Sequence, residues 1–215
     1  QEVSFYRTIS DDLKRYFPMI YNIENKETYS SYEMEYISKP NLSEIYLFGE
    51  IGPNAILRII NSIEMIFKKF YEKQNLLEEN ASWLYSTKLE SRQVEFEKVI
   101  NKSEFSFLKK IYISDFKVNN YQFPFLKKTF NFLKKELIKF EKIRPIHVGH
   151  GDLCFNNILV DPIYGSINLI DPKAEKHIAF DKCGVIDNFY DLSKLNHSIE
   201  GLYDSVVNNL FNLKT

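Results

Sequence analysis

The sequence predicts an α+β protein that is mainly helical and carries one short β-hairpin in its C-terminal third. Long segments in the middle of the chain place apolar residues at three- and four-residue steps, as on the buried face of a helix. Two short β-type runs flank a turn-forming stretch at residues 161–166. Of the 215 residues, 44% are hydrophobic and 15% aromatic, which is enough to fill a substantial core.

Charge and cysteine content exclude several classes of protein. A net charge of −1 at pH 7 gives no overall attraction to nucleic acid or to an anionic membrane. The two cysteines, Cys154 and Cys183, make no disulfide framework. No apolar run approaches the ~18 residues that a membrane helix needs. We therefore expect a reduced, cytoplasmic protein without a membrane span.

The first forty residues combine helix and strand signals. Residues 2–16 alternate apolar and polar as a helix does, and Ser10 is a capping signal ahead of two aspartates. Residues 31–37 alternate with a period of two and run into a turn at Lys39-Pro40-Asn41. We expect a strand there.

Three long helices are predicted in the middle of the chain. The first covers residues 54–72, where isoleucines and aromatic residues fall on one stripe. The second covers residues 83–100 and the third residues 124–142, with Pro124 in a first turn that tolerates proline. The chain returns to helix from about Phe189.

Three polar side chains surround the predicted hairpin of residues 158–160 and 167–170. Asp152 and Asn157 precede its first strand, and Asp171 follows its second. A hairpin returns its far end to its near end, so we expect these side chains to converge. Carboxylate and amide oxygens suit Mg²⁺, and a remaining carboxylate can accept a proton from a substrate hydroxyl. This set predicts a site for metal-assisted phosphoryl transfer.

The segment His-Gly-Asp-Leu-Cys-Phe-Asn-Asn, residues 150–157, is followed by the hairpin and by Ile170-Asp171. It resembles the catalytic loop and metal motif of the aminoglycoside phosphotransferase and choline kinase family. The resemblance implies a protein-kinase-like fold, in which residues 38–215 are the mainly helical C-terminal lobe. Residues 1–37 would be a remnant of the N-terminal lobe and the hinge.

The same resemblance implies roles for individual residues. Asp152 would be the catalytic base, and Asn157 and Asp171 would hold magnesium. His150 would pack beneath the loop as structural support. Asp191 stands in a segment similar to the family's Tyr-Asp-Leu-Ala-Lys-Leu motif, where the aspartate braces the loop; a helix cap is the alternative for this residue.

Nucleotide contacts are implied near the end of the predicted first strand. Met34, Glu35 and Ile37 resemble the hinge between kinase lobes. The carbonyl of Glu35 and the amide of Ile37 would pair with the adenine of ATP, or the guanine of GTP, with Met34 behind the base. A buried strand end is the alternative.

Further charged residues are candidate contacts to substrate or phosphate. Lys88 and Arg92 lie one helical turn apart and can grip an anionic substrate, although a solvated pair is the alternative. Lys173 follows the predicted metal ligand. Acidic residues that can meet a cationic acceptor are Glu175, Asp181 and Asp187.

The predicted function is therefore a small-molecule kinase that uses Mg²⁺ and ATP or GTP. A hydroxyl of a sugar, an amino alcohol or an aminoglycoside would be the acceptor. Gly151 and Pro172, together with the absence of an Ala-Pro-Glu anchor, distinguish the chain from protein kinases. The motif is similar to that of bacterial proteins of capsule or surface-polysaccharide synthesis. Some of those are fused to nucleotidyltransferases, so such a domain is an expected partner.

Two other functions stay open. The first glycine is Gly49, and residues 1–50 contain no glycine-rich phosphate-binding loop. We therefore expect the N-terminal lobe to be largely missing and ATP-dependent turnover to be weak or absent. A non-catalytic kinase-like binding module is the alternative function, and a hydrolase that uses the carboxylate cluster without nucleotide is the third.

Overall fold

The computed structural model has a mixed α+β fold, as predicted. It describes residues 2–26, 28–72, 74–80, 84–102, 106–140, 143–173 and 185–212. The chain forms two compact units, one of residues 1–77 and 145–212, the other of residues 78–144 and 213–215. The predicted lobe boundary after residue 37 lies inside the first unit, and the assignment to kinase lobes stays a prediction.

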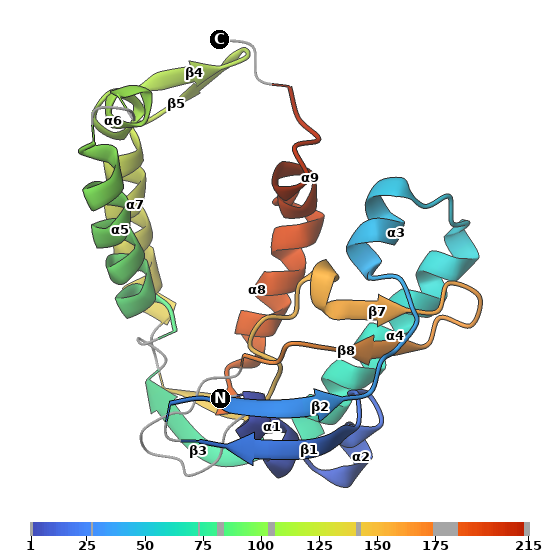
Figure 1. Ribbon diagram of the computed structural model, residues 1–215. Coiled ribbons are helices and arrows are strands. Elements are labelled where there is room, and N and C mark those ends of the chain that lie inside the picture. Colours follow the sequence, from blue (N-terminus) through green and yellow to red (C-terminus); the bar gives the residue numbers. More distant parts are fainter. Residues whose placement is uncertain are drawn as a thin grey trace. The chain divides into compact units, whose positions relative to one another are not determined.

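The N-terminal segment forms two short helices and a hairpin (Figure 1). Helix α1 (Glu2–Thr8) ends before helix α2 (Asp11–Lys14), and the predicted capping residue Ser10 is the N-cap of α2, with extended backbone at φ −67° and ψ 149°. Strands β1 (Ile20–Asn25) and β2 (Ser30–Met34) pair antiparallel. The predicted strand is thus present, but it ends at Met34, before the predicted end at Ile37.

Two helices follow this hairpin. Helix α3 (Leu42–Phe48) begins with a capping box, in which Asn41 accepts the Glu44 amide proton at 2.8 Å and Glu44 accepts that of Asn41 at 3.2 Å. Helix α4 (Pro53–Glu72) confirms the first long predicted helix.

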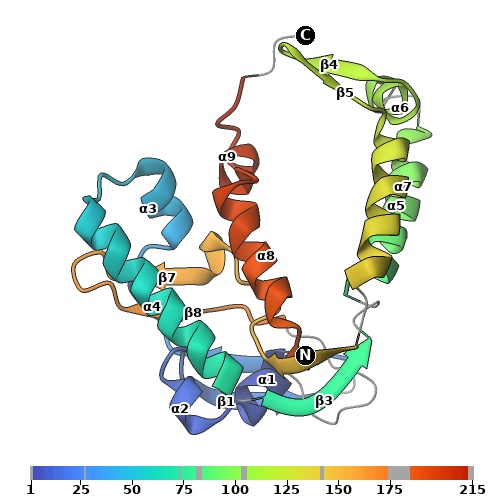
Figure 2. The ribbon, with the colours of Figure 1, turned by 180° about the vertical axis from the view of Figure 1, so that it is seen from behind.

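The predicted hairpin near the C-terminal end is confirmed. Strands β7 (Ile158–Val160) and β8 (Ile167–Leu169) pair antiparallel, with Ile158 opposite Leu169 and Val160 opposite Ile167. Strand β7 lies against α3 and β8 against α4 (Figures 1 and 2). The end residues of both strands are buried, and only the central residues, Leu159 and Asn168, are half-buried.

The remaining elements around the hairpin are short strands and the C-terminal helices. The sequence reasoning did not predict strands β3, β6 and β9, which form one sheet in the order β3–β6–β9. The predicted return to helix is confirmed by α8 and α9. The bounds are β3 (Gln74–Asn80), β6 (Ile143–Val148), the 3-10 turn η2 (Phe155–Asn157), β9 (Val185–Ile186), α8 (Asn188–Ile199) and α9 (Tyr203–Val207).

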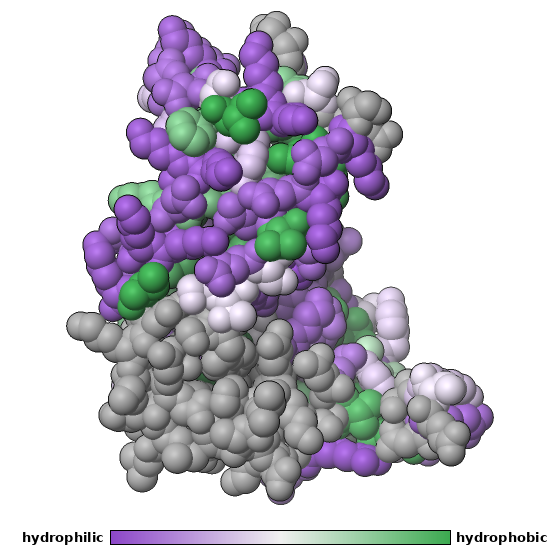
Figure 3. All heavy atoms as spheres, turned by 90° about the vertical axis from the view of Figure 1, so that its left-hand side faces the viewer, coloured by the Kyte–Doolittle hydropathy of each residue, from purple (hydrophilic) through white to green (hydrophobic). Residues whose placement is uncertain are grey.

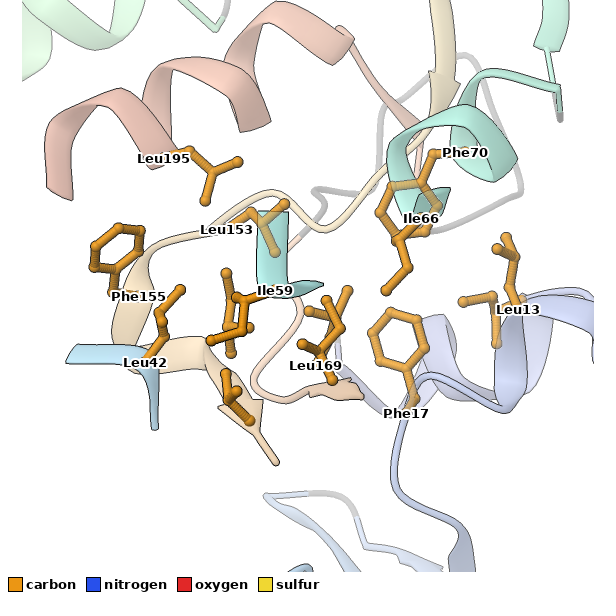
Figure 4. Close-up of a cluster of buried hydrophobic side chains, with 14 of the residues drawn as sticks. Leu13, Phe17, Leu42, Ile59, Ile66, Phe70, Leu153, Phe155, Leu169 and Leu195 are labelled. Atoms are coloured by element: carbon orange, nitrogen blue, oxygen red, sulfur yellow. The ribbon is translucent and has the colours of Figure 1, made fainter. Parts of the chain in front are cut away.

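One hydrophobic core joins these elements. Figure 4 shows its side chains pointing toward one another from α2, α3, α4, α8, the loop before β7, and β8. Burial of such residues stabilises each by about 1.5–3 kcal/mol. Because Leu153 and Phe155 belong to this core, the loop before β7 packs against the same residues as the helices. Members that Figure 4 labels are Leu13, Phe17, Leu42, Ile59, Ile66, Phe70, Leu153, Phe155, Leu169 and Leu195.

The second unit is a helical assembly with its own small hairpin. The second and third long predicted helices are confirmed within it as α5 and α7. Helix α5 begins at Ser86. Trp83 and residues 141–142, which the predictions included, lie outside the described residues. The face over these helices is mainly hydrophilic in Figure 3, with separate hydrophobic side chains. The bounds are α5 (Ser86–Ile100), α6 (Ser106–Ile113), β4 (Phe116–Val118), β5 (Tyr121–Phe123) and α7 (Leu126–Phe140).

A small aromatic cluster, partly buried, joins α5, α6 and α7 in this second unit. The rings of Phe96, Tyr112 and Phe130 contact one another, with centroids 5.7–6.4 Å apart. Gln93 donates to the Tyr112 hydroxyl at 3.0 Å, and that hydroxyl donates to Glu97. Across both units, none of the described helices has the length and apolarity to span a bilayer.

Candidate active site

Helix α8 holds the loop between β6 and β7 through a buried aspartate. Asp191 accepts the amide protons of His150 at 2.6 Å and of Gly151 at 2.8 Å, one on each carboxylate oxygen. Burial raises the pKa of Asp191 to about 6, against the opposing effect of these amide protons. Both carboxylate oxygens of Asp191 thus hold the backbone of the loop in place.

His150 connects this loop to the end of β8. Its Nε2 lies 2.9 Å from the Ile170 carbonyl oxygen, and its Nδ1 accepts the Asp152 amide proton at 3.3 Å. These partners select the neutral tautomer with the proton on Nε2. Burial lowers the pKa of His150 to about 4, which keeps the ring neutral at pH 7. The ring also stacks on Phe17, with centroids 6.2 Å apart.

Two glycines let the loop approach helix α8 closely. Gly151 has φ of 83°, in the region that side chains disfavour. At Gly149, a Cβ atom would lie 2.2 Å from Cγ2 of Ile186 and 2.8 Å from Oδ2 of Asp191. The motif's glycine and the one before it are therefore required by backbone geometry and by space.

The ends of the β7–β8 hairpin bring Asp152, Asn157 and Asp171 together. Nδ2 of Asn157 donates to the Asp152 carbonyl oxygen at 2.9 Å, and the Ile170 amide donates to the Asn157 carbonyl at 3.1 Å. Asp171 follows with φ of 56°, a left-handed conformation that turns the chain sharply after β8. The side chains of Asp152 and Asp171 are 17% and 47% exposed, so one is recessed and the other open.

Two lysines neutralise these carboxylates. Nζ of Lys173 lies 3.0 Å from Oδ2 of Asp152 and 2.9 Å from Oδ2 of Asp171, and Nζ of Lys194 lies 2.8 Å from Oδ1 of Asp152. Burial alone would raise the pKa of Asp152. The two ammonium groups lower it by more, so that its net pKa lies below the usual value. The carboxylates likewise raise the pKa of Lys173, Asp171 more than Asp152. Asp152 is therefore a carboxylate at neutral pH.

The mouth of the hairpin, where Asn157 precedes β7 and Asp171 follows β8, carries oxygen ligands that suit magnesium. Among the described residues, no three His, Cys, Asp or Glu side chains gather as metal ligands. Mg²⁺ commonly takes one or two protein oxygens and completes its shell with phosphate and water. The amide of Asn157 and the carboxylate of Asp171 match that requirement. Because Lys173 contacts Oδ2 of Asp171, its ammonium group has to leave that oxygen before a cation can bind it.

The predicted hinge residues lie at the end of β2, in the same compact unit as the loop. Met34 is 43% exposed. The Glu35 amide donates to the Met19 carbonyl at 2.8 Å, and the Met19 amide donates to the Glu35 carboxylate at 3.1 Å. The Ile37 carbonyl accepts the Lys39 amide proton at 2.9 Å. A pairing with adenine through Glu35 and Ile37 stays a prediction.

The other predicted contacts are dispersed. Lys88 and Arg92 lie on α5 in the second unit, where Arg92 forms an exposed pair with Glu95 at 2.7 Å. Glu175 and Asp181 lie outside the described residues. Asp187 caps α8 by accepting the Phe189 amide proton at 3.0 Å and is 2% exposed, so its prediction as an acceptor contact is wrong.

Sequence reasoning missed Lys194, which contacts Asp152 directly. The available signal was its place in α8, three residues after Asp191, because residues three apart share one face of a helix. If Asp191 faces the loop, Lys194 is therefore expected on the same face of α8, where it can contact Asp152.

Comparison with protein-family models, with curated proteins and with solved structures found no match to this chain. The resemblance to phosphotransferases therefore stays a prediction from the sequence motifs.

Proposed function

We propose that this chain carries the phosphoryl-transfer site of a small-molecule kinase that uses Mg²⁺ and ATP or GTP. The observation that carries the proposal is the mouth of the β7–β8 hairpin. There a recessed carboxylate, Asp152, adjoins one amide and one carboxylate, Asn157 and Asp171, on a loop braced from below. Phosphoryl transfer needs these groups, because its catalysis consists mainly of positioning and charge stabilisation.

Each residue has a task in this proposal. Asn157 and Asp171 hold the magnesium ion, which supplies positive charge to the transferring phosphate. Asp152 shares the ammonium group of Lys173 with Asp171. In the proposed reaction Asp152 orients the acceptor hydroxyl and accepts its proton. Lys173 moves from the carboxylates to the anionic phosphates. His150 and Asp191 keep the loop in shape through the backbone contacts of the buried side.

The acceptor class that we propose is a sugar, an amino alcohol or an aminoglycoside. Surface-polysaccharide synthesis in a bacterial cytoplasm is the proposed setting, with a nucleotidyltransferase domain as the proposed partner. These two proposals rest on the sequence similarity of residues 150–159 alone. The adenine would pair with the backbone of Glu35 and Ile37.

One observation favours the second candidate, a non-catalytic binding module. Lysines contact both side-chain oxygens of Asp152, and these ion pairs oppose the transfer of a proton to its carboxylate. In an enzyme the nucleotide draws one lysine away, whereas in a binding module both ion pairs persist with ligand bound.

Measurements of thermal stability and ATP cleavage on the full-length protein distinguish the kinase from the binding module. We expect Mg²⁺-ATP to raise the thermal midpoint beyond the effect of Mg²⁺ alone, because bound ligand stabilises the folded state. Asp152→Asn should keep this shift but lower ATP cleavage, measured against a panel of alcohol acceptors and against water, by about 10²-fold or more.

Asp11→Asn is the matched control, because Asp11 pairs with Lys14 on the surface of the same unit. It should leave both the thermal shift and the cleavage rate unchanged. Absence of any nucleotide-dependent shift would refute the kinase. A shift without cleavage in the unsubstituted protein would establish the binding module.

A further inference from the structure

The two lysines at Asp152 differ in how firmly the fold holds them. The Lys194 side chain is 32% exposed, whereas that of Lys173 is 55% exposed. Lys194 gives its ammonium group to Oδ1 of Asp152 at 2.8 Å, and its Nζ lies 5.9 Å from the Tyr190 ring centroid. Lys173 instead divides its ammonium group between Asp152 and Asp171.

Helix α8 grips the loop at two levels. Asp191 holds the loop backbone through the amides of His150 and Gly151. Lys194, three residues later on the same helix face, holds the side chain of Asp152. A rigid helix therefore sets both the loop's path and the direction of its carboxylate.

The two carboxylate oxygens of Asp152 are consequently not equivalent. Oδ1 is held by the lysine that is anchored in the helix, and Oδ2 by the lysine that is more exposed and shared. An exposed ammonium group on a flexible side chain can reorient toward anionic phosphates more readily than one that is recessed against a helix. Ligand binding thus frees Oδ2 first.

We propose that Lys194 is the positioning residue of Asp152, holding Oδ1 so that Oδ2 is the oxygen presented to the acceptor hydroxyl. This assignment rests on the proposed kinase function. The hydroxyl proton moves to Oδ2 while the hydroxyl oxygen forms a bond to the γ-phosphorus of the nucleotide. The bond from that phosphorus to the β–γ bridging oxygen breaks, and the nucleoside diphosphate leaves with the electron pair.

The first test examines the ion pair without any ligand. In full-length protein carrying ¹⁵N-labelled lysine, the Lys194 ammonium signal, assigned with Lys194→Met, should be protected from solvent exchange. It should lose that protection in Asp152→Asn, while the signal of Lys68, which pairs with Glu64 on the surface, stays unchanged. If the protection of the Lys194 signal from solvent exchange is the same in Asp152→Asn as in the unsubstituted protein, the proposal is overturned.

The second test separates positioning from nucleotide affinity, with Mg²⁺-ATP cleavage by water as the reaction. Lys194→Met removes the charge and keeps the length, and should lower kcat by about ten-fold or more with KM within about two-fold. Lys194→Arg should recover part of kcat. Lys173→Met should raise KM instead, and Lys68→Met should change neither quantity.

Two results would contradict the positioning role. One is an unchanged kcat in Lys194→Met. The other is a joint loss of thermal stability, kcat and affinity that Lys194→Arg does not relieve, because that pattern marks a merely structural side chain. If Asp152→Asn cleaves ATP as fast as the unsubstituted protein, the proposed kinase function fails, and the ammonium signal alone decides the ion pair.

Discussion

The molecule contains two small hairpins that match in backbone pattern and differ in burial. Both β4–β5 and β7–β8 pair two three-residue strands antiparallel. In β7–β8, Ile158 and Leu169 are at most 1% exposed, whereas Tyr121 and Phe123 of β5 are 71% and 40% exposed. Across β4–β5 the rings of Phe116 and Phe123 stack, with their centroids 5.6 Å apart.

The buried hairpin is also tied to the rest of its unit by hydrogen bonds. The Val160 amide donates to the Pro40 carbonyl at 2.9 Å, and the Leu169 amide donates to the Tyr16 carbonyl at 2.6 Å. Lys39 donates to the Asn168 side chain at 2.8 Å. Pairing alone thus makes a hairpin, but placing polar groups with precision requires a hairpin that is anchored on both strands.

The largest difference between the hairpins should appear on truncating a side chain. Ile158→Ala empties a fully buried position and should reduce the free energy of unfolding by about 4 kcal/mol. Val118→Ala in β4 should reduce it by less than about 1 kcal/mol, because Val118 is only half-buried. Urea denaturation followed by circular dichroism measures both. Equal losses would show that burial does not distinguish the hairpins.

The anchoring of the buried hairpin should also respond to pH through two opposing groups. His150 has a folded pKa of about 4 against an ordinary 6.5, so its contribution to stability falls as the pH drops from 6.5 to 4. Asp191 has a folded pKa of about 6 against 3.8, so its contribution rises over the same drop. Each amounts to roughly 3 kcal/mol, and they largely cancel.

Substituting either group should expose the other. His150→Gln should raise the stability of the protein at pH 4.5 relative to pH 7, and Asp191→Asn should lower it, each compared with the unsubstituted protein. Urea midpoints at the two pH values measure this. Identical pH dependence in all three proteins would contradict the opposing assignments.

The smallest effect should come from the exposed turn between β4 and β5. Asn119 has φ of 54°, which glycine adopts at no steric cost. Asn119→Gly should change the free energy of unfolding by less than about 0.5 kcal/mol, and Asn119→Ala should lower it by about 1 kcal/mol. A larger loss for glycine than for alanine would show that the asparagine side chain itself holds the turn.

Local pattern predicted the hairpin β7–β8, helix α4 and the convergence of Asp152 with Asp171. Each depends on the period of apolar residues or on turn formers within a few positions. Ser10 was predicted as a capping signal and is the N-cap of α2. The end of α1 at Thr8 was not predicted, because the apolar period runs through both helices. The contact from Lys194 to Asp152 was missed for a different reason: helical spacing places Lys194 on the same face as Asp191, but it does not say that this face lies against the loop.

Helix α8 also determines when the loop acquires its shape during protein synthesis. The groups that grip the loop from this helix are Asp191, Lys194 and Ser198, the last accepting the Phe155 amide proton at 3.2 Å. A ribosome delivers residues 188–199 after the whole hairpin has emerged. The nascent chain can therefore pair β7 with β8 early, but its aspartate acquires a direction only when the last long helix docks.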